Sequence, residues 1–227
     1  ALLIESSARK GETRTGVTLF TGMALAILEL PFIVAEHEYG HFAEYSRAGF
    51  RKFVTVVDEE EHLINDPWDM IQWSARLIDQ GRHVVASIET QDFYSTLWAN
   101  PALLANFDYF LIMANAGGLN QSQYSLDQFS YRVYAGKAHI LDGIGWFLRL
   151  NQTIRYPIDD EGDIMDYLGL LRKHGIHSGV GQLKGVQWLK YFSGSSIAMW
   201  NGLYDFIEKD ETRVPTPPAY WQSLRAI

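Results

Sequence analysis

Three residues have the types and spacing of a metal-dependent hydrolase site: His37, Glu38 and His41. They form the H-E-x-x-H pattern, in which the two histidines lie on one face of a helix, one turn apart. Two imidazoles placed in this way can bind one zinc ion, and the glutamate beside the first can activate a metal-bound water. The pattern therefore predicts a zinc metalloendopeptidase that hydrolyses peptide bonds.

The residues around the motif predict the helix that this chemistry needs. Residues 17–35 are almost entirely apolar, with Glu29 as their one charge, and are rich in good helix formers. Pro31 is expected to kink or restart the helix just before the motif, and Gly49 is expected to end it. Residues 50–57, with their β-branched and aromatic side chains, then predict a strand.

The later segments predict a fold that is mainly α with a few short strands. Helices are expected over residues 68–80 and 163–173, and a short strand is expected over residues 83–88. Gly117-Gly118, which polar residues follow, predicts a loop. The active-site helix that carries the H-E-x-x-H motif is the central element of this fold.

Length and composition limit the class of protein. The 227 residues predict one metallopeptidase-like domain over residues 1–227, and the opening residue, Ala1, fits a fragment of a longer chain. The formal net charge of −8 argues against a nucleic-acid partner, because phosphate binding requires clustered Lys and Arg. The absence of cysteine excludes disulfides and thiolate zinc ligands.

The apolar run before the motif bears on the location of the protein. Residues 17–35 come close to the roughly 20 apolar residues that a membrane-spanning helix needs. This run favours membrane-embedded helices, membrane association and a membrane location. The mean hydropathy of the whole chain is slightly negative, which favours the alternative, a cytoplasmic protein with buried helices.

A catalytic zinc site needs a third protein ligand, and the sequence leaves three options. The first is Asp142, which stands between Leu and Gly. The second is Glu60 or Glu61, which follow the predicted strand, and the third is another histidine. The metzincin spacing is excluded, because it requires Gly at position 44 and His at position 47, where this chain has Glu44 and Arg47.

The segment from His37 to Gly49, with the strand after it, resembles the first active-site segment of site-2-protease-type zinc metallopeptidases. That family pairs the segment with a downstream Leu-Asp-Gly, whose aspartate is the third zinc ligand. Leu141-Asp142-Gly143 matches this tripeptide, although the Asn and Pro that usually precede it are absent. The resemblance implies His37, His41 and Asp142 as zinc ligands, Glu38 as the catalytic base, and a protein or peptide substrate.

The same segment resembles the active-site helix of thermolysin-like gluzincins about equally well. In that family the third ligand is a glutamate on a following helix, near the position of Glu60 or Glu61. The Asn before that glutamate and the Asp four residues after it are absent here, and Asn65 occupies the latter place.

Two other classes of protein stay open as alternatives. Glu38-x-x-His41 and Glu59-x-x-His62 have the spacing of di-iron carboxylate bundles, which would make the protein an oxidase or oxygenase. That reading requires both pairs on facing helices. A non-enzymatic membrane or scaffold protein with a degenerate motif is the last alternative, and it predicts no bound metal.

Overall fold

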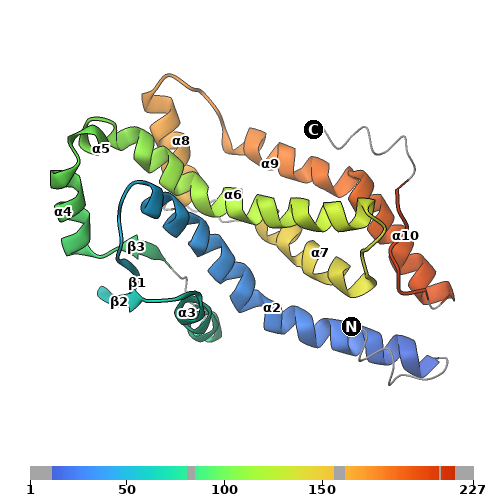
Figure 1. Cartoon of the computed structure of the whole chain (residues 1–227). Helices are drawn as coiled ribbons and strands as arrows, with labels where there is room; N and C mark the ends of the chain where they lie inside the picture. The colour runs from blue at the N-terminus through green and yellow to red at the C-terminus, as the bar shows by residue number, and fades with distance from the viewer. Residues whose placement is uncertain (1–11, 81–84, 156–161, 210, 218–227) are drawn as a thin grey trace. The chain divides into compact units, whose positions relative to one another are not determined.

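The computed structural model describes residues 12–80, 85–155, 162–209 and 211–217 (Figure 1). The predicted fold class, mainly α with a few short strands, is confirmed, and α3 and α8 match the helices predicted over 68–80 and 163–173. In chain order the elements are α2 (Glu12–Arg47), β1 (Phe53–Val57), β2 (Glu60–Ile64), α3 (Pro67–Asp79), β3 (Ala86–Ile88), α4 (Thr90–Ala99), α5 (Pro101–Ala105), α6 (Phe107–Tyr134), α7 (Ile140–Arg155), α8 (Asp163–Lys173), α9 (Val180–Leu189), the short 3-10 helix η1 (Lys190–Phe192) and α10 (Gly194–Lys209).

The chain divides into two compact units, whereas the sequence predicts a single domain over residues 1–227. The motif unit takes its described residues from 30–123 and 156–182, and the helical unit takes its described residues from 1–29, 124–155 and 183–227. Both units therefore combine stretches that are far apart in the sequence. Helices α2 and α6 each contribute residues to both units.

Helix α2 carries the H-E-x-x-H motif and ends at the predicted place. Gly49 has a φ of +102°, and the N–H groups of Gly49 and Phe50 bond to the carbonyl oxygens of Ser46 and Tyr45 at 3.0 and 3.1 Å. This is the Schellman arrangement, which favours glycine because a left-handed residue with a Cβ is strained. Pro31 lies inside one continuous helix, so the helix does not restart there.

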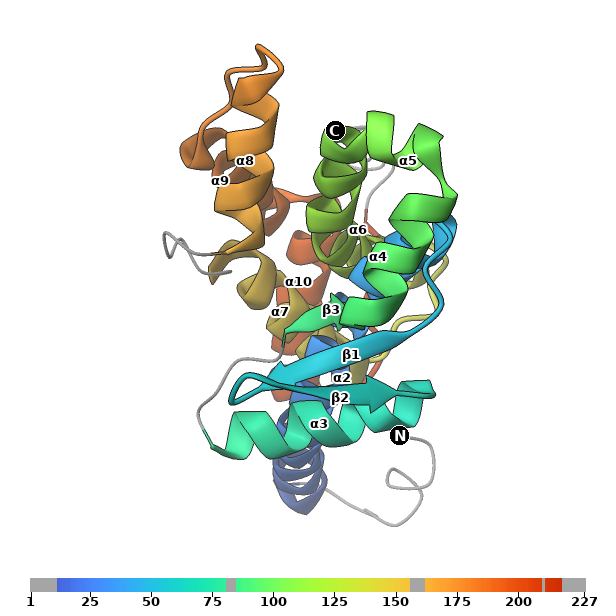
Figure 2. The same cartoon turned by 90° about the vertical axis from the view of Figure 1, so that its left-hand side faces the viewer.

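The motif unit contains the sheet, whose strand order is β2-β1-β3 with both pairings antiparallel (Figure 2). The predicted strands are confirmed as β1 and, within the described residues, β3. Helix α3 packs on the sheet through buried Met70 and Leu77, which belong to one apolar cluster with Ile64 of β2 and Phe42 of α2. Burial of these side chains fixes the motif-bearing part of α2 against the sheet.

The loop predicted at Gly117-Gly118 is wrong, because both residues lie inside α6. The physical reason is a close approach of two helix backbones within the motif unit. A Cβ on Gly117 would lie 2.5 Å from the carbonyl oxygen of Gly40, and a Cβ on Gly40 would overlap the carbonyl oxygen of Gly117. The low helix propensity of glycine is offset here, since only glycine permits this contact between α2 and α6.

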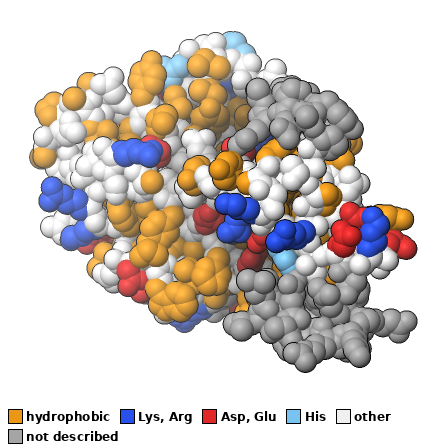
Figure 3. Space-filling model, turned by 45° about the vertical axis from the view of Figure 1, so that its right-hand side comes forward, with side chains coloured by type: hydrophobic (Ala, Val, Ile, Leu, Met, Phe, Trp, Pro, Cys, Tyr) orange, Lys and Arg blue, Asp and Glu red, His pale blue; other side chains and the backbone are white. Residues whose placement is uncertain are grey.

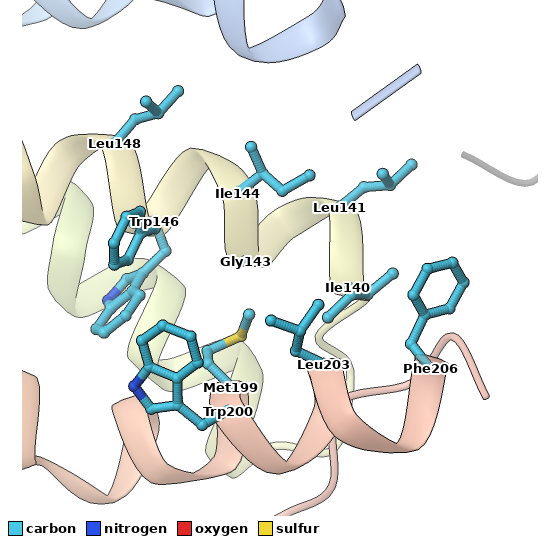
Figure 4. Close-up of a pocket in the computed structure, with 11 residues that line it drawn as sticks. Ile140, Leu141, Gly143, Ile144, Trp146, Leu148, Met199, Trp200, Leu203 and Phe206 are labelled. Atoms are coloured by element: carbon cyan, nitrogen blue, oxygen red, sulfur yellow. The ribbon is translucent and has the colours of Figure 1, made fainter. Parts of the chain in front are cut away.

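The helical unit has its own apolar core. Leu126 and Val133 of α6 pack with Trp146 and Leu150 of α7 and with Phe206 of α10 in one buried cluster. Between α7 and α10 this unit also contains a pocket of about 260 Å³, whose lining residues have no charged, hydroxyl or amide side chain (Figure 4). The pocket therefore offers no acid, base or metal ligand for hydrolysis.

Within the described residues, one helical segment, Phe20–Arg47, is long and apolar enough to cross a membrane. The side chains of Phe20, Met23 and Ile27 are about two-thirds exposed or more, and the surface in Figure 3 also shows patches of apolar side chains. By length and composition alone, the segment fits a membrane span and the core helix of a soluble protein equally well. The membrane location stays a prediction.

We expect the substitution Gly40→Ala to lower the free energy of unfolding by about 1–3 kcal/mol, because its Cβ would meet the backbone of Gly117, which cannot move aside as a side chain can. Urea denaturation in the presence of a chelator measures this without a contribution from metal binding. The matched control is Gly169→Ala, at an exposed site of α8 with open space around it. This control should be neutral or stabilise by up to about 1 kcal/mol, and equal losses in the two variants would contradict the helix contact.

Candidate metal centre

Three side chains of the motif unit meet at one point: His37, His41 and Asp163. The histidines come from successive turns of α2, and the aspartate is the first residue of α8. The two imidazole Nε2 atoms lie 3.4 Å apart, and Oδ2 of Asp163 lies 3.4 Å from Nε2 of His37 and 3.1 Å from Nε2 of His41. Around one tetrahedral zinc ion with bonds of about 2.05 Å, ligand atoms are separated by roughly 3.3 Å. The three donor atoms therefore have the mutual separations expected of ligands to a single ion.

The second nitrogen of each imidazole is held by α6. Nδ1 of His41 donates to the carbonyl oxygen of Ala114 at 2.7 Å, which assigns the proton to Nδ1 and leaves a lone pair on Nε2. Nδ1 of His37 lies 3.2 Å from the hydroxyl oxygen of Ser122. Partners of this kind fix the orientation and tautomer of metal-binding histidines. Both rings therefore present Nε2 to the centre.

Gly118 of α6 leaves the space in which the two Nε2 atoms lie. A Cβ at this position would overlap Nε2 of both His37 and His41. Gly117 and Gly118, from which a loop is predicted, thus have two separate functions in the motif unit. Gly117 permits the contact with α2, and Gly118 leaves room for the imidazoles.

The charges at the centre favour a cation. Burial opposes protonation of His41, but the hydrogen bond and the negative charge of Asp163 outweigh this effect and raise the pKa of the imidazole. The same field that attracts a proton to this ring attracts a metal ion. The side chains of His37 and His41 are 3% and 5% exposed, whereas that of Asp163 is 29% exposed, so the centre meets solvent on the side of the aspartate.

Glu38 is buried beside the histidines and is held by the edge strand β3. Its Oε2 accepts a hydrogen bond of 2.9 Å from the N–H of Ala86. Burial raises the pKa of the Glu38 carboxyl above its ordinary value, while the charges of His37 and His41 and the hydrogen bond from Ala86 oppose this rise. This hydrogen bond uses only one of the two carboxylate oxygens.

Asp142, which the sequence predicts as the third ligand, belongs to the helical unit. Its carboxylate accepts hydrogen bonds from the backbone N–H of His139 at 2.9 Å and from the guanidinium of Arg132 at 3.1 Å. Nδ1 of His139 in turn accepts from the N–H of Leu141 at 3.1 Å, so these residues form a reciprocal cap at the start of α7. The structure thus gives Asp142 a helix-capping role, and its role as a zinc ligand stays a prediction.

The alternative ligands Glu60 and Glu61 lie on strand β2, whereas the gluzincin arrangement places the third ligand on a helix. The Glu61 carboxylate accepts hydrogen bonds from the N–H and the hydroxyl of Thr90. Neither glutamate belongs to a metal-binding cluster among the described residues. The structure therefore brings Asp163, rather than either glutamate, to the two histidines.

The second E-x-x-H pair does not lie on a helix. Glu59 is in the turn between β1 and β2, with a φ of +67°, and His62 is in β2, where its ring lies 4.5 Å from that of Trp73. The two residues consequently lack the one-turn helical spacing that the di-iron alternative requires.

Sequence reasoning missed Asp163 as a ligand. The residue lies far downstream of His41 and follows an acidic stretch, residues 159–161, so neither its type nor its spacing distinguishes it. The one available signal is its place at the start of a predicted helix. An acid there is usual, because the helix N-terminus favours negative charge.

Comparison with known proteins finds no matching family model, curated protein or solved structure. The resemblance to site-2-protease-type metallopeptidases therefore stays a prediction from the motif. The geometry of His37, His41, Asp163 and Glu38 is the observation from which a function can be argued.

We expect Asp163→Ala to weaken zinc binding at least about a hundredfold, more than the 10–100-fold loss typical of removing a partner that only supports a ligand. Competition with a chromophoric chelator measures the affinity. The matched control is Asp166→Ala, on an exposed position of the same helix, which should bind zinc as the wild type does. Asp142→Ala should also retain zinc. Loss of zinc in Asp142→Ala, with zinc retained in Asp163→Ala, would instead support the ligand set predicted from the sequence.

Proposed function

We propose that the protein is a zinc-dependent metalloendopeptidase in which His37, His41 and Asp163 hold the metal. The observation that supports this most strongly is the spacing of 3.1–3.4 Å among the three donor atoms. Two histidines and one carboxylate are a ligand set of catalytic zinc sites, in which three protein ligands leave one position for water or substrate. The partial exposure of Asp163 would give that position access to solvent.

Glu38 is the residue that most favours hydrolysis as the reaction of this centre. When bound, zinc lowers the pKa of a water molecule and polarises the peptide carbonyl. Glu38 accepts the proton of the attacking water and passes it to the leaving amine. The N–H of Ala86 holds one oxygen of this carboxylate, and the contacts of Ala114 and Ser122 hold the histidine rings, so these side chains are oriented before a substrate binds.

The same donor set, two histidines and one carboxylate, also occurs in mononuclear iron oxygenases. Those enzymes do not need a buried carboxylate beside the ligands, and Glu38 is such a group here. The di-iron alternative lacks its second helical E-x-x-H pair. Elemental analysis of the purified protein separates these readings, since one zinc per chain supports hydrolysis and bound iron supports oxidation.

We expect Glu38→Gln to retain one zinc per chain and to lower the rate of peptide hydrolysis by about 10²–10⁴-fold, the usual contribution of a general acid–base group. The amide has the shape of the carboxylate and cannot accept the proton. Cleavage of unfolded casein, followed by the release of labelled peptides, measures the rate.

The matched control for Glu38→Gln is Glu36→Gln, two residues earlier on α2 and outside the metal cluster. This variant should cleave casein at close to the wild-type rate. Hydrolysis at the wild-type rate in zinc-loaded Glu38→Gln would remove Glu38 from its role. Loss of zinc from Glu38→Gln would instead make this residue part of the ligand set.

A further inference from the structure

A second hollow of the motif unit, of about 300 Å³, shares residues with the surroundings of the metal centre. Its wall includes Ala114, whose carbonyl oxygen accepts the hydrogen bond from Nδ1 of His41. It also includes Tyr45, which follows His41 by one turn of α2. This hollow, which we call the side pocket, therefore adjoins residues that surround the metal centre.

The side pocket is lined by aromatic rings and by a few polar side chains. Tyr45, Phe93, Tyr94 and Phe110 supply four aromatic rings, and Phe110 belongs to a buried apolar cluster that gives the floor a rigid support. Ser87, Thr90 and Asn115 supply neutral polar groups. Glu61 is the one charged side chain among the residues that line the side pocket.

We infer that the side pocket binds a basic side chain, Arg or Lys, of the peptide substrate; this inference rests on the proposed function. The long apolar stem of such a side chain can lie along the aromatic walls, and its cationic head can lie over a ring face. The head then meets the carboxylate of Glu61. A guanidinium suits this pocket best, because it stacks on aromatic rings and also binds a carboxylate through two hydrogen bonds.

Glu61 is held in place for this role. Its carboxylate accepts hydrogen bonds from the backbone N–H and the hydroxyl of Thr90. A carboxylate has about four acceptor positions, so it can still bind a guanidinium. Glu60, the preceding residue on β2, points to the opposite face of the strand and does not line the side pocket.

The hydroxyl of Tyr45 does not add a charge to the side pocket. Burial, together with the negative charges of Asp163 and Glu38, raises the pKa of the Tyr45 hydroxyl. The tyrosine therefore stays neutral at ordinary pH. Neither Lys nor Arg is among the residues that line the side pocket, so a basic side chain of the substrate meets no like charge there.

The inference can be tested by binding, without turnover, on zinc-loaded Glu38→Gln. The probes are two fluorescein-labelled alanine-rich peptides that differ at one position, which is arginine in one and norleucine in the other. Fluorescence anisotropy gives the two dissociation constants. We expect the arginine peptide to bind about tenfold more tightly, the gain of one charge-assisted contact, and the ratio to fall at high salt.

Two further variants, each made in the Glu38→Gln protein, identify the group responsible. Glu61→Gln should bring the ratio of the two dissociation constants close to one. Glu61→Lys is compared on the arginine peptide and a glutamate peptide, and it should bind the glutamate peptide more tightly. Glu60→Gln is the matched control and should keep the full preference. The inference would be overturned if the protein with Glu61 intact bound both peptides equally well. It would also be overturned if Glu60→Gln and Glu61→Gln lost the arginine preference to the same extent.

The proposed function has a separate readout, the zinc content and casein cleavage of the wild type. If the wild type binds zinc but cleaves nothing, the proposed function fails, whereas the peptide ratio still reports on the side pocket. If the protein binds no zinc, the proposed function fails as well, and the same ratio is then measured on Glu38→Gln without zinc. If the wild type cleaves casein but its zinc-loaded Glu38→Gln variant shows no arginine preference, only the inference about the side pocket fails.

Discussion

The backbone contact between α2 and α6 is the constraint on which the metal centre depends. Gly40 and Gly117 let the two helices approach until their carbonyl groups limit the distance. At this distance Ala114 and Ser122 of α6 can bond to the histidines of α2. A larger separation would leave both imidazoles without the partners that orient them. The positions of the ligands thus follow from the absence of two side chains that are not themselves part of the site.

The sequence predicts the parts of this structure that depend on local interactions. The motif helix, its end at Gly49, the strands predicted over 50–57 and 83–88 and the helices over 68–80 and 163–173 follow from side-chain period and capping. The glycine pair in α6 could not be read correctly, because its reason is a contact with a distant helix. Asp142 and Asp163 show the same limit, since both begin helices and a carboxylate suits a cap and a ligand equally well. Only the fold shows that Asp163 meets the histidines.

The polar groups of the centre are costly to bury without a cation. Glu38 and both histidines are almost inaccessible to water, and Asp163 is a second carboxylate at the same point. The two carboxylates repel each other, as the effect of Asp163 on the pKa of Glu38 shows. Buried charges are usually paired or bind metals, because an uncompensated charge in the interior costs several kcal/mol or more. A bound divalent ion would remove this cost.

Asp163 begins α8, whereas both histidines lie on α2. Along the chain, the three strands and helices α3 to α7 lie between them. An ion coordinated by all three side chains would tie the beginning of α8 to α2, as a disulfide ties two distant cysteines. Such a cross-link stabilises mainly by restricting the unfolded chain, and its effect grows with the length of the loop that it closes. Metal would then act on folding as well as on chemistry. The ion-free protein would be the looser form, with α8 held mainly by its buried side chains Ile164 and Leu168.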